Sequence, residues 1–303
     1  MTVQERTKPQ VAIMNAVHDL PVLVARDLGF FKDEGLDIDF VTTPGMAQVT
    51  TSHQVKFESI FDRPLDAAYN DGGIDQYRMC EWGIMKRAVE ADTAGIRRRK
   101  IVALGASMSK FAIVVDRKSN IYEPEMLKNQ LISVTPNNGS HFTMLKMIEG
   151  FVEQPHVKTT NAGSMAKRIE ALKRGDVDAV VLMEPWISVA QKEGLRILIE
   201  SHSTRSEAAS DEIDGATLAA MFRAQARAVS DIEKDPTPFL HYFVAETGGR
   251  LEAKDFQSWR LLHAPPQPYT RERFDDTYNW TVKWNMTVPG ATYENTVDNR
   301  AWT

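Results

Sequence analysis

The chain has 303 residues, of which 43% are hydrophobic and 25% are charged, as is typical of a soluble globular protein. This composition excludes a disordered or collagen-like chain, and the length allows two lobes of ordinary domain size. The net charge of −5 gives no basic surface for nucleic acid, so no nucleic-acid partner is expected.

The N-terminal residues are polar and lead directly into an apolar segment at Val11. They contain no apolar signal region, cleavage site or lipid-accepting cysteine, so a cytoplasmic location is expected. If a leader has been removed, the expected location is the periplasm or the cell surface. No apolar run reaches the ~18 residues that a membrane span needs, so the protein is not expected to span a membrane.

The first elements in chain order are a strand over 11–14, a helix to about residue 31 and a half-exposed strand over 36–41. Asp19 is expected to cap the helix, with Pro21 in its first turn. Thr43 and Gly45 follow the second strand and are candidate donors at the rim of a ligand site.

Two later stretches look alike. From Ala171 to Trp186, a helix ends at Gly175, and an apolar run over 179–183 predicts a buried parallel strand. An earlier Asp-Ala pair in the stretch 65–72 predicts a short strand over 66–69, followed by a helix over 74–90. The repetition predicts two similar α/β lobes.

The second half alternates between strands and helices, which predicts a parallel sheet with right-handed crossovers. The region beyond residue 211 is predicted to be helical with no convincing strand. The expected strands of this half are 100–105, 111–115, 131–134, 156–159, 177–183 and 195–199, and its expected crossover helices are 140–151 and 164–173.

Four stretches resemble one family in the same order along the chain. They run from Asp27 to Phe40, Gly139 to Phe142, Gly175 to Ala179 and Glu184 to Trp186. They resemble type 2 periplasmic binding proteins, in the branch that binds nitrate, taurine, alkanesulfonates and thiamine precursors and includes thiamine pyrimidine synthase-like proteins. The resemblance extends over nearly the whole chain, and its fold hosts both transport components and enzymes.

The resemblance implies a two-lobe α/β fold in which each lobe is a mostly parallel sheet flanked by helices, with a helical C-terminal region. Lobe I would comprise residues 1–108 and 187–303, and lobe II residues 109–186. Two crossovers, near 106–112 and 183–187, would form a hinge.

A candidate anion site lies where a helix opens at Gly139, because the first amides of a helix lack internal partners and its dipole favours an anion. Ser140 can cap this helix or donate to a ligand, and His141 is a further candidate contact. The resemblance implies that this junction binds a carboxylate, a sulfonate or another small oxyanion. A plain helix cap is the alternative.

Other candidate ligand contacts follow the carboxyl ends of predicted strands, where ligands bind in open α/β sheets. Ordinary roles remain open for them, such as a surface histidine, a core aromatic or a hinge-shaping proline. The candidates are Asn15, His18, Tyr69, Asp71, Gly72, Glu184 and Trp186.

The motifs of common catalytic centres are missing. The sequence contains no Gly-x-Ser-x-Gly elbow, no metal-spaced His/Cys cluster and no phosphate loop, so no cofactor or metal is expected. Cys80, the single cysteine, falls inside the predicted 74–90 helix with no activating neighbour, which favours a buried structural thiol.

Two functions from different classes remain. The first is a solute-binding protein of the ABC-importer type, which holds an organic anion or heteroaromatic molecule between its lobes and delivers it to a membrane subunit. The second is a cytoplasmic enzyme on the same scaffold, such as a lyase, a desulfinase or a pyrimidine-forming synthase. The missing leader favours the enzyme, and the missing nucleophile constellation favours the binding protein.

Overall fold

The computed structural model describes residues 8–42, 60–91 and 94–303, so the predicted rim residues Thr43 and Gly45 lie outside the described part. One sheet has the strand order β2-β1-β3-β8-β4-β7-β5-β6, and β9 pairs with β4. The strands are β1 (Gln10–Ala12), β2 (Asp39–Val41), β3 (Gln76–Cys80), β4 (Lys100–Val115), β5 (Leu131–Ser133), β6 (Lys158–Thr160), β7 (Ala179–Met183), β8 (Arg196–Ala209) and β9 (Leu262–His263).

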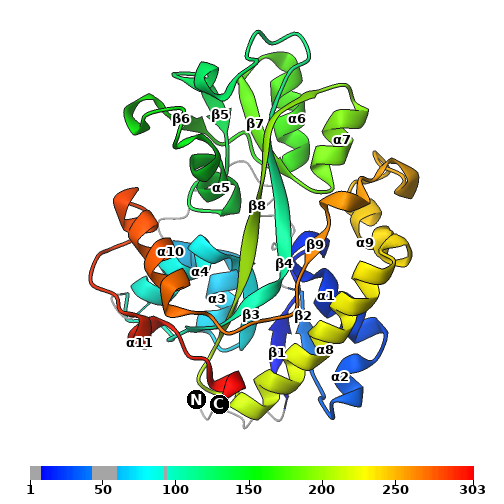
Figure 1. The fold of residues 1–303 in the computed structure, drawn as a ribbon, viewed down its shortest axis with the longest axis vertical. Helices are drawn as coiled ribbons and strands as arrows, with labels where there is room; N and C mark the ends of the chain where they lie inside the picture. Colours follow the sequence, from blue (N-terminus) through cyan, green and yellow to red (C-terminus); the bar gives the residue numbers. More distant parts are fainter. Residues whose placement is uncertain (1–7, 43–59, 92–93) are drawn as a thin grey trace.

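Two long antiparallel strands, β4 and β8, run through the molecule and join its two lobes (Figure 1). In lobe I, β1 pairs parallel with β2 and β3. In lobe II, β5 pairs parallel with β6 and β7. The structure therefore confirms the predicted two-lobe α/β fold with mostly parallel sheets.

Helices cover both lobes, and the region after β8 is mainly helical, as the sequence predicts, apart from the short strand β9. Helix α8 packs against α1, and α10 packs against α4. The helices are α1 (Ala16–Asp27), α2 (Phe30–Asp33), α3 (Pro64–Asn70), α4 (Glu81–Glu90), α5 (Gly139–Ile148), α6 (Met165–Arg174), α7 (Trp186–Lys192), α8 (Gly215–Lys234), α9 (Leu240–Ala245), α10 (Arg271–Lys283) and α11 (Tyr293–Thr296).

The centre of lobe II is β7, and all five of its residues are buried. Helices on both faces of a parallel sheet leave its inner strands no polar side, so such strands are continuously apolar. Each fully buried Val or Leu side chain contributes roughly 1.5–3 kcal/mol. The buried strand predicted from the apolar run 179–183 is confirmed.

The strand predicted over 66–69 is wrong, because these residues belong to helix α3. Pro64 occupies the start of α3, where its fixed φ suits the first turn and its missing N–H has no cost. The predicted 74–90 helix is also wrong in its first part, since β3 precedes α4 there. The apolar residues of this short window fit either period, so periodicity alone could not distinguish a helix from a strand.

The two similar stretches predicted from the sequence do exist. However, the residue that matches Asp178 is Asp75, nine positions beyond the predicted Asp66. Gly72 and Gly175 both have φ 76°, and each donates to a carbonyl three residues back to end its helix, α3 or α6. Asp75 then matches Asp178. Each carboxylate accepts from the first amide of the neighbouring strand, with Gln10 N at 2.9 Å and Leu131 N at 2.7 Å.

The helix cap predicted at Asp19 is also wrong. The N-cap of α1 is Asn15, whose side chain accepts from His18 N. Asp19 instead lies in the first turn, where it accepts from Met14 N at 2.6 Å and pairs with the buried Arg78 at 2.7 Å. The helix thus begins earlier than Pro21 indicates, and His18 lies in its first turn.

Candidate functional site

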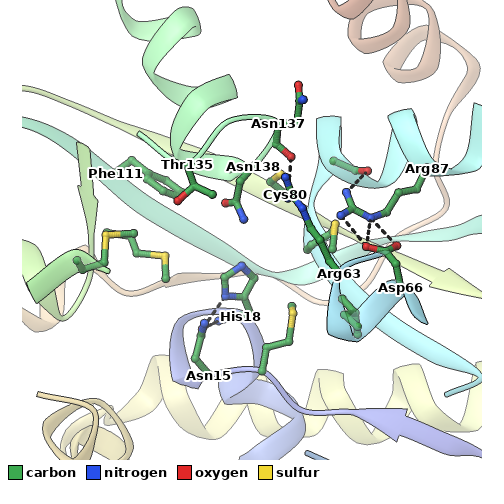
Figure 2. A pocket seen from close by; sticks show the side chains of 17 residues that line it. Asn15, His18, Arg63, Asp66, Cys80, Arg87, Phe111, Thr135, Asn137 and Asn138 are labelled. Carbon is green, nitrogen blue, oxygen red and sulfur yellow. Dashed lines mark hydrogen bonds and ion pairs between the residues drawn. The ribbon is translucent and has the colours of Figure 1, made fainter. Parts of the chain in front are cut away.

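A cavity of about 100 Å³ lies between the two lobes, at the carboxyl ends of β1, β3, β5 and β7 (Figure 2). Parallel strands direct their following loops and helix N-termini to this edge of a sheet, which is why ligands bind there. The lining residues are Met14, Asn15, His18, Arg63, Leu65, Asp66, Met79, Cys80, Gly83, Arg87, Phe111, Thr135, Asn137, Asn138, Gly139, Met165 and Met183.

His18 points into the cavity from the first turn of α1. Asn15 Oδ1 accepts from His18 N at 3.1 Å and lies 2.6 Å from His18 Nδ1, so Nδ1 carries the proton of the neutral ring. Burial and the charges of Arg205 and Arg78 hold the pKa of His18 well below its usual value. The neutral ring therefore leaves Nε2 as an acceptor.

The carboxylate of the cavity wall, Asp66, is already neutralised. Arg87 donates to both of its oxygens, at 2.8 Å each, and Arg99 donates to Oδ1 at 2.9 Å. A bidentate pair of this kind fixes α3 against α4. Asp66 therefore shapes the wall rather than supplying free negative charge to a ligand.

Arg63 joins the two lobes across the cavity. It precedes α3 in lobe I, and its guanidinium donates to Pro136 O at 2.9 Å and to Asn137 O at 3.3 Å in the loop before α5. A second contact between lobes lies outside the cavity, where Trp280 Nε1 donates to Glu149 Oε2 at 2.7 Å. Side chains of the two lobes therefore meet at and beside the cavity in this structure.

Cys80 lies on the cavity wall, in contrast to the predicted position inside a helix. It is the last residue of β3 and the N-cap of α4. Burial raises the pKa of its thiol, while the charge of Arg205 and the amide of Gly83 lower it. The argument that kept Cys80 away from the site is thus wrong, although burial favours the neutral thiol.

Gly139 opens α5 and packs between Phe111 of its own lobe and Cys80 of lobe I. A Cβ on this residue would lie 3.3 Å from Phe111 Cζ and 3.5 Å from Cys80 Sγ. Ser140 is buried, and its hydroxyl accepts from Thr135 N at 3.0 Å, so it braces the loop before the helix. His141 Nδ1 accepts from Asn137 N at 3.3 Å, and burial lowers the pKa of this ring to about 4.

The structure brings Asn15, His18 and Gly139 together at the cavity and places the other described candidates elsewhere. Tyr69 is buried in lobe I and donates to Arg98 O at 2.9 Å. Asp71 and Gly72 follow the end of α3. Glu184 and Trp186 flank the start of α7, beyond the cavity residue Met183.

The sequence did not identify several of the residues that line the cavity. Arg63 and Arg87 carry no local signal, because their role depends on contacts with distant segments. Cys80 does carry one, because aligning Gly72 with Gly175 places a strand over 76–80 and puts the cysteine at its carboxyl end. Thr135, Asn137 and Asn138 follow β5 in the same way.

Neither a cluster of metal ligands nor a membrane-spanning helix is found in the described ranges. No three His, Cys, Asp or Glu side chains within 8–42, 60–91 and 94–303 gather closely enough to hold a metal ion. Within the same ranges, no helix combines the length and the apolar character that crossing a membrane requires.

No protein-family model matches the chain, and no curated protein sequence matches it. Solved structures do match. One is the alkanesulfonate-binding protein SsuA from Xanthomonas axonopodis pv. citri bound to MOPS, with 16% identity, a TM-score of 0.71 and coverage of 94% of this chain and 96% of that chain.

Two further matches show the range of proteins with this architecture. The desulfurization enzyme DszB is 14% identical, with a TM-score of 0.61 and 98% of each chain covered. The CA3427 gene product of Candida albicans, described as having the generic periplasmic binding protein fold, is 12% identical, with a TM-score of 0.69 and 97% of each chain covered. The chain therefore has the periplasmic binding protein fold.

Proposed function

We propose that the protein binds a small organic anion or heteroaromatic molecule between its lobes and closes over it, as a solute-binding protein of the ABC-importer type does. The observation that carries this proposal is the cavity itself, which both lobes line and which Arg63 bridges. A ligand held there contacts both lobes only in the closed form, so it would shift the open–closed equilibrium by its differential affinity.

The hinge of this movement is proposed to lie in β4 and β8, which connect the lobes. One of the three register shifts in their pairing lies between Leu104 and Met108, close to the predicted first crossover. We place the return from lobe II along β8, because α7 packs against α6 and β7 before β8 begins. The division of the chain into 1–108 with 187–303 and 109–186 would then shift its second boundary into β8.

The proposed partner is the membrane subunit of an importer, and the proposed location is the periplasm or the cell surface. Two solved neighbours are named periplasmic or alkanesulfonate-binding proteins, which supports the proposal without extending their ligands to this chain.

The test is a small panel of probes: MOPS as a sulfonate, benzoate as a carboxylate and 4-aminopyrimidine as a neutral heteroaromatic. Thermal unfolding would detect binding, since a probe at about 100 times its Kd stabilises the protein by about 2.7 kcal/mol. Small-angle scattering would then detect closure as a smaller radius of gyration. A stabilising probe that leaves the radius of gyration unchanged would contradict a closing cleft.

The second candidate is a thiol-dependent enzyme, and the position of Cys80 on the cavity wall favours it. The decisive measurement is turnover of any bound probe, followed over hours by mass spectrometry of the probe. Binding without turnover in the wild type, with unchanged binding in Cys80→Ala, excludes this candidate. Turnover that Cys80→Ala abolishes while binding persists establishes it.

A further inference from the structure

The ring of His18 extends into the cavity from the side of lobe I, and Asn15 fixes its protonation (Figure 2). Asn15 Oδ1 lies 3.1 Å from His18 N and 2.6 Å from His18 Nδ1. Because a backbone N–H only donates, the Asn15 atom that it reaches has to be the amide oxygen. The same oxygen accepts from Nδ1, so Nδ1 carries the proton of the neutral ring.

The second ring nitrogen, Nε2, is then an unprotonated acceptor that faces the cavity. In the described part of the chain the ring is bonded to Asn15, and no N–H or O–H group there donates to Nε2. Burial and the charges of Arg205 and Arg78 hold the pKa of the ring well below its usual value, which supports the neutral form. A buried acceptor without a donor costs free energy, so closure of the lobes over a ligand requires a partner for Nε2.

A buried ion pair holds the loop that carries Asn15. Asp19 Oδ2 accepts from Met14 N at 2.6 Å and from Asn15 N at 3.0 Å. Arg78 Nη1 donates to Asp19 Oδ1 at 2.7 Å and to Ala12 O at 3.1 Å. A plain helix cap needs only the bond from the backbone to Asn15. The ring contact and the support behind the loop go beyond what the cap needs.

Other side-chain oxygens in this part of the wall are already engaged. Arg87 and Arg99 donate to the carboxylate of Asp66. Asn15 Oδ1 accepts twice from His18. His18 Nε2 is thus an acceptor that remains available to a ligand on the side of lobe I.

We propose that His18 determines the specificity of the cavity, because its Nε2 accepts a hydrogen bond from an N–H or O–H group of the ligand while Asn15 fixes the tautomer. This inference rests on the proposed function and specifies one feature of its ligand. A methyl group, a carbonyl oxygen or an unprotonated ring nitrogen facing Nε2 would leave the lone pair unpaired. A site built for a donor rejects an analogue of the same shape that lacks the donor.

The test compares two pairs of probes in which a methyl group replaces an amino group: benzamide with acetophenone, and 4-aminopyrimidine with 4-methylpyrimidine. Calorimetry measures their affinities for the wild type and three variants. His18→Phe keeps a ring but removes the acceptor, and Asn15→Leu removes the group that fixes the tautomer. His241→Phe, which changes an exposed histidine of lobe I bonded to Pro238 O, is the control.

Nitrogen-15 NMR of protein labelled at histidine provides a readout that a merely structural role would not change. It distinguishes protonated from unprotonated ring nitrogens, and His18→Phe identifies the signals of His18 by their loss. We expect an unprotonated Nε2 in the ligand-free wild type. This signal should move when the amino probe binds, because Nε2 then accepts a hydrogen bond, and the proton should redistribute between the two nitrogens in Asn15→Leu.

We expect the wild type to bind the amino member of at least one pair at least about tenfold more tightly than the methyl member. His18→Phe should abolish that preference, Asn15→Leu should reduce it, and His241→Phe should keep it. The comparison within the wild type needs no variant, so it remains decisive if His18→Phe does not fold.

Four results would overturn the inference. They are a proton on Nε2 in the wild type, equal affinities within both pairs, an undiminished preference in folded His18→Phe, and no binding of either amino probe. Compaction around a methyl probe bound as tightly as its amino partner would overturn the role of His18 and leave the proposed function standing. A preference for the amino probe without compaction would support His18 and contradict the closing cleft.

Discussion

At the scale of single residues, Gly139 connects the predicted anion site to the contact between the lobes. The sequence points to this position because a helix begins there, and the structure adds that the residue packs against Phe111 of its own lobe and against Cys80 of the other lobe. The absence of a side chain therefore allows a ligand to approach the backbone, and it also allows the two lobes to come into close contact.

We expect Gly139→Val to weaken binding of any probe that compacts the wild type by at least about tenfold, or about 1.4 kcal/mol. The reason is steric, because a Cβ would already lie 3.4 Å from Cys80 Cβ of lobe I and 3.3 Å from Phe111 Cζ, and the two methyl groups would extend further. Calorimetry measures the affinity, and scattering should show a larger radius of gyration at saturation. Unchanged affinity would place the anion away from the start of α5.

Glu246 provides a second test at this scale. Its carboxylate accepts from Ala16 N at 2.6 Å at the start of α1, and burial raises its pKa to about 7. Because the folded pKa exceeds the ordinary value of 4.5, the folded state holds the proton more tightly than the unfolded state. The associated stability is complete below about pH 4.5 and is lost as the pH rises to about 7.

We expect Glu246→Gln to remove this pH dependence while keeping an oxygen acceptor for Ala16 N. Above pH 7 the variant should be more stable than the wild type by roughly 1–3 kcal/mol, given about 1.36 kcal/mol per pKa unit. Urea unfolding at pH 5 and pH 8 measures the difference. Parallel stability profiles for the two proteins would contradict the raised pKa.

At the scale of elements, the segment from α3 to α4 shows where sequence patterns fail. Period alone could not distinguish a strand over 66–69 from a helix, and the choice depends on Asp66 meeting Arg87 and Arg99. Helix α3 then positions Arg63 to reach the loop before α5. Closure of the cleft therefore depends on an element whose type the local sequence leaves ambiguous.

We expect Arg63→Met to weaken ligand-induced closure, because it removes both hydrogen bonds from lobe I to Pro136 O and Asn137 O. Affinity for a compacting probe should fall about tenfold, while the stability of the ligand-free protein should change by less than about 1 kcal/mol. Scattering and calorimetry are the measurements, with the exposed Arg117→Met as the control. A full reduction in the radius of gyration by the variant would show that Arg63 does not hold the closed form.

At the scale of the whole molecule, the chain beyond α8 returns to contact lobe II. Arg260 is buried there, with its Nη2 2.6 Å from Glu200 Oε1 and its Nη1 3.3 Å from Glu184 Oε1. Burial raises the pKa of Glu184 to about 7, against the opposing effect of Arg260. This cluster joins the C-terminal region to the start of α7 and to the half of β8 that lies in lobe II.

We expect Arg260→Met to destabilise the protein by about 3–5 kcal/mol at pH 8, because it leaves the buried carboxylate of Glu184 and the partly buried one of Glu200 without their cation. The loss should be smaller at pH 5, where Glu184 is protonated and needs no counter-charge. Chemical unfolding measures both values, and Arg174→Met, which breaks an exposed ion pair, should cost at most about 1 kcal/mol. Equal losses at the two pH values would contradict the role assigned to Glu184.

The sequence by itself determined the two-lobe α/β fold, the buried strand β7, the turn at Gly175 and the helix that opens at Gly139. The two-lobe fold was indicated by the repeated stretches and by the family resemblance, whereas the other three features depend on local physics, namely apolar periodicity and a backbone conformation that favours glycine. The pairing of Asn15 with His18 is local too, and both residues were expected at the site.

Only the tertiary structure decided the link from Arg63 to lobe II and the burial of Arg205 opposite Cys80. Each depends on partners far along the chain, such as the pairing of β3 with β8 or the contact of α3 with the loop before α5. Burial and charge balance are sums over such distant neighbours, so no local pattern encodes them.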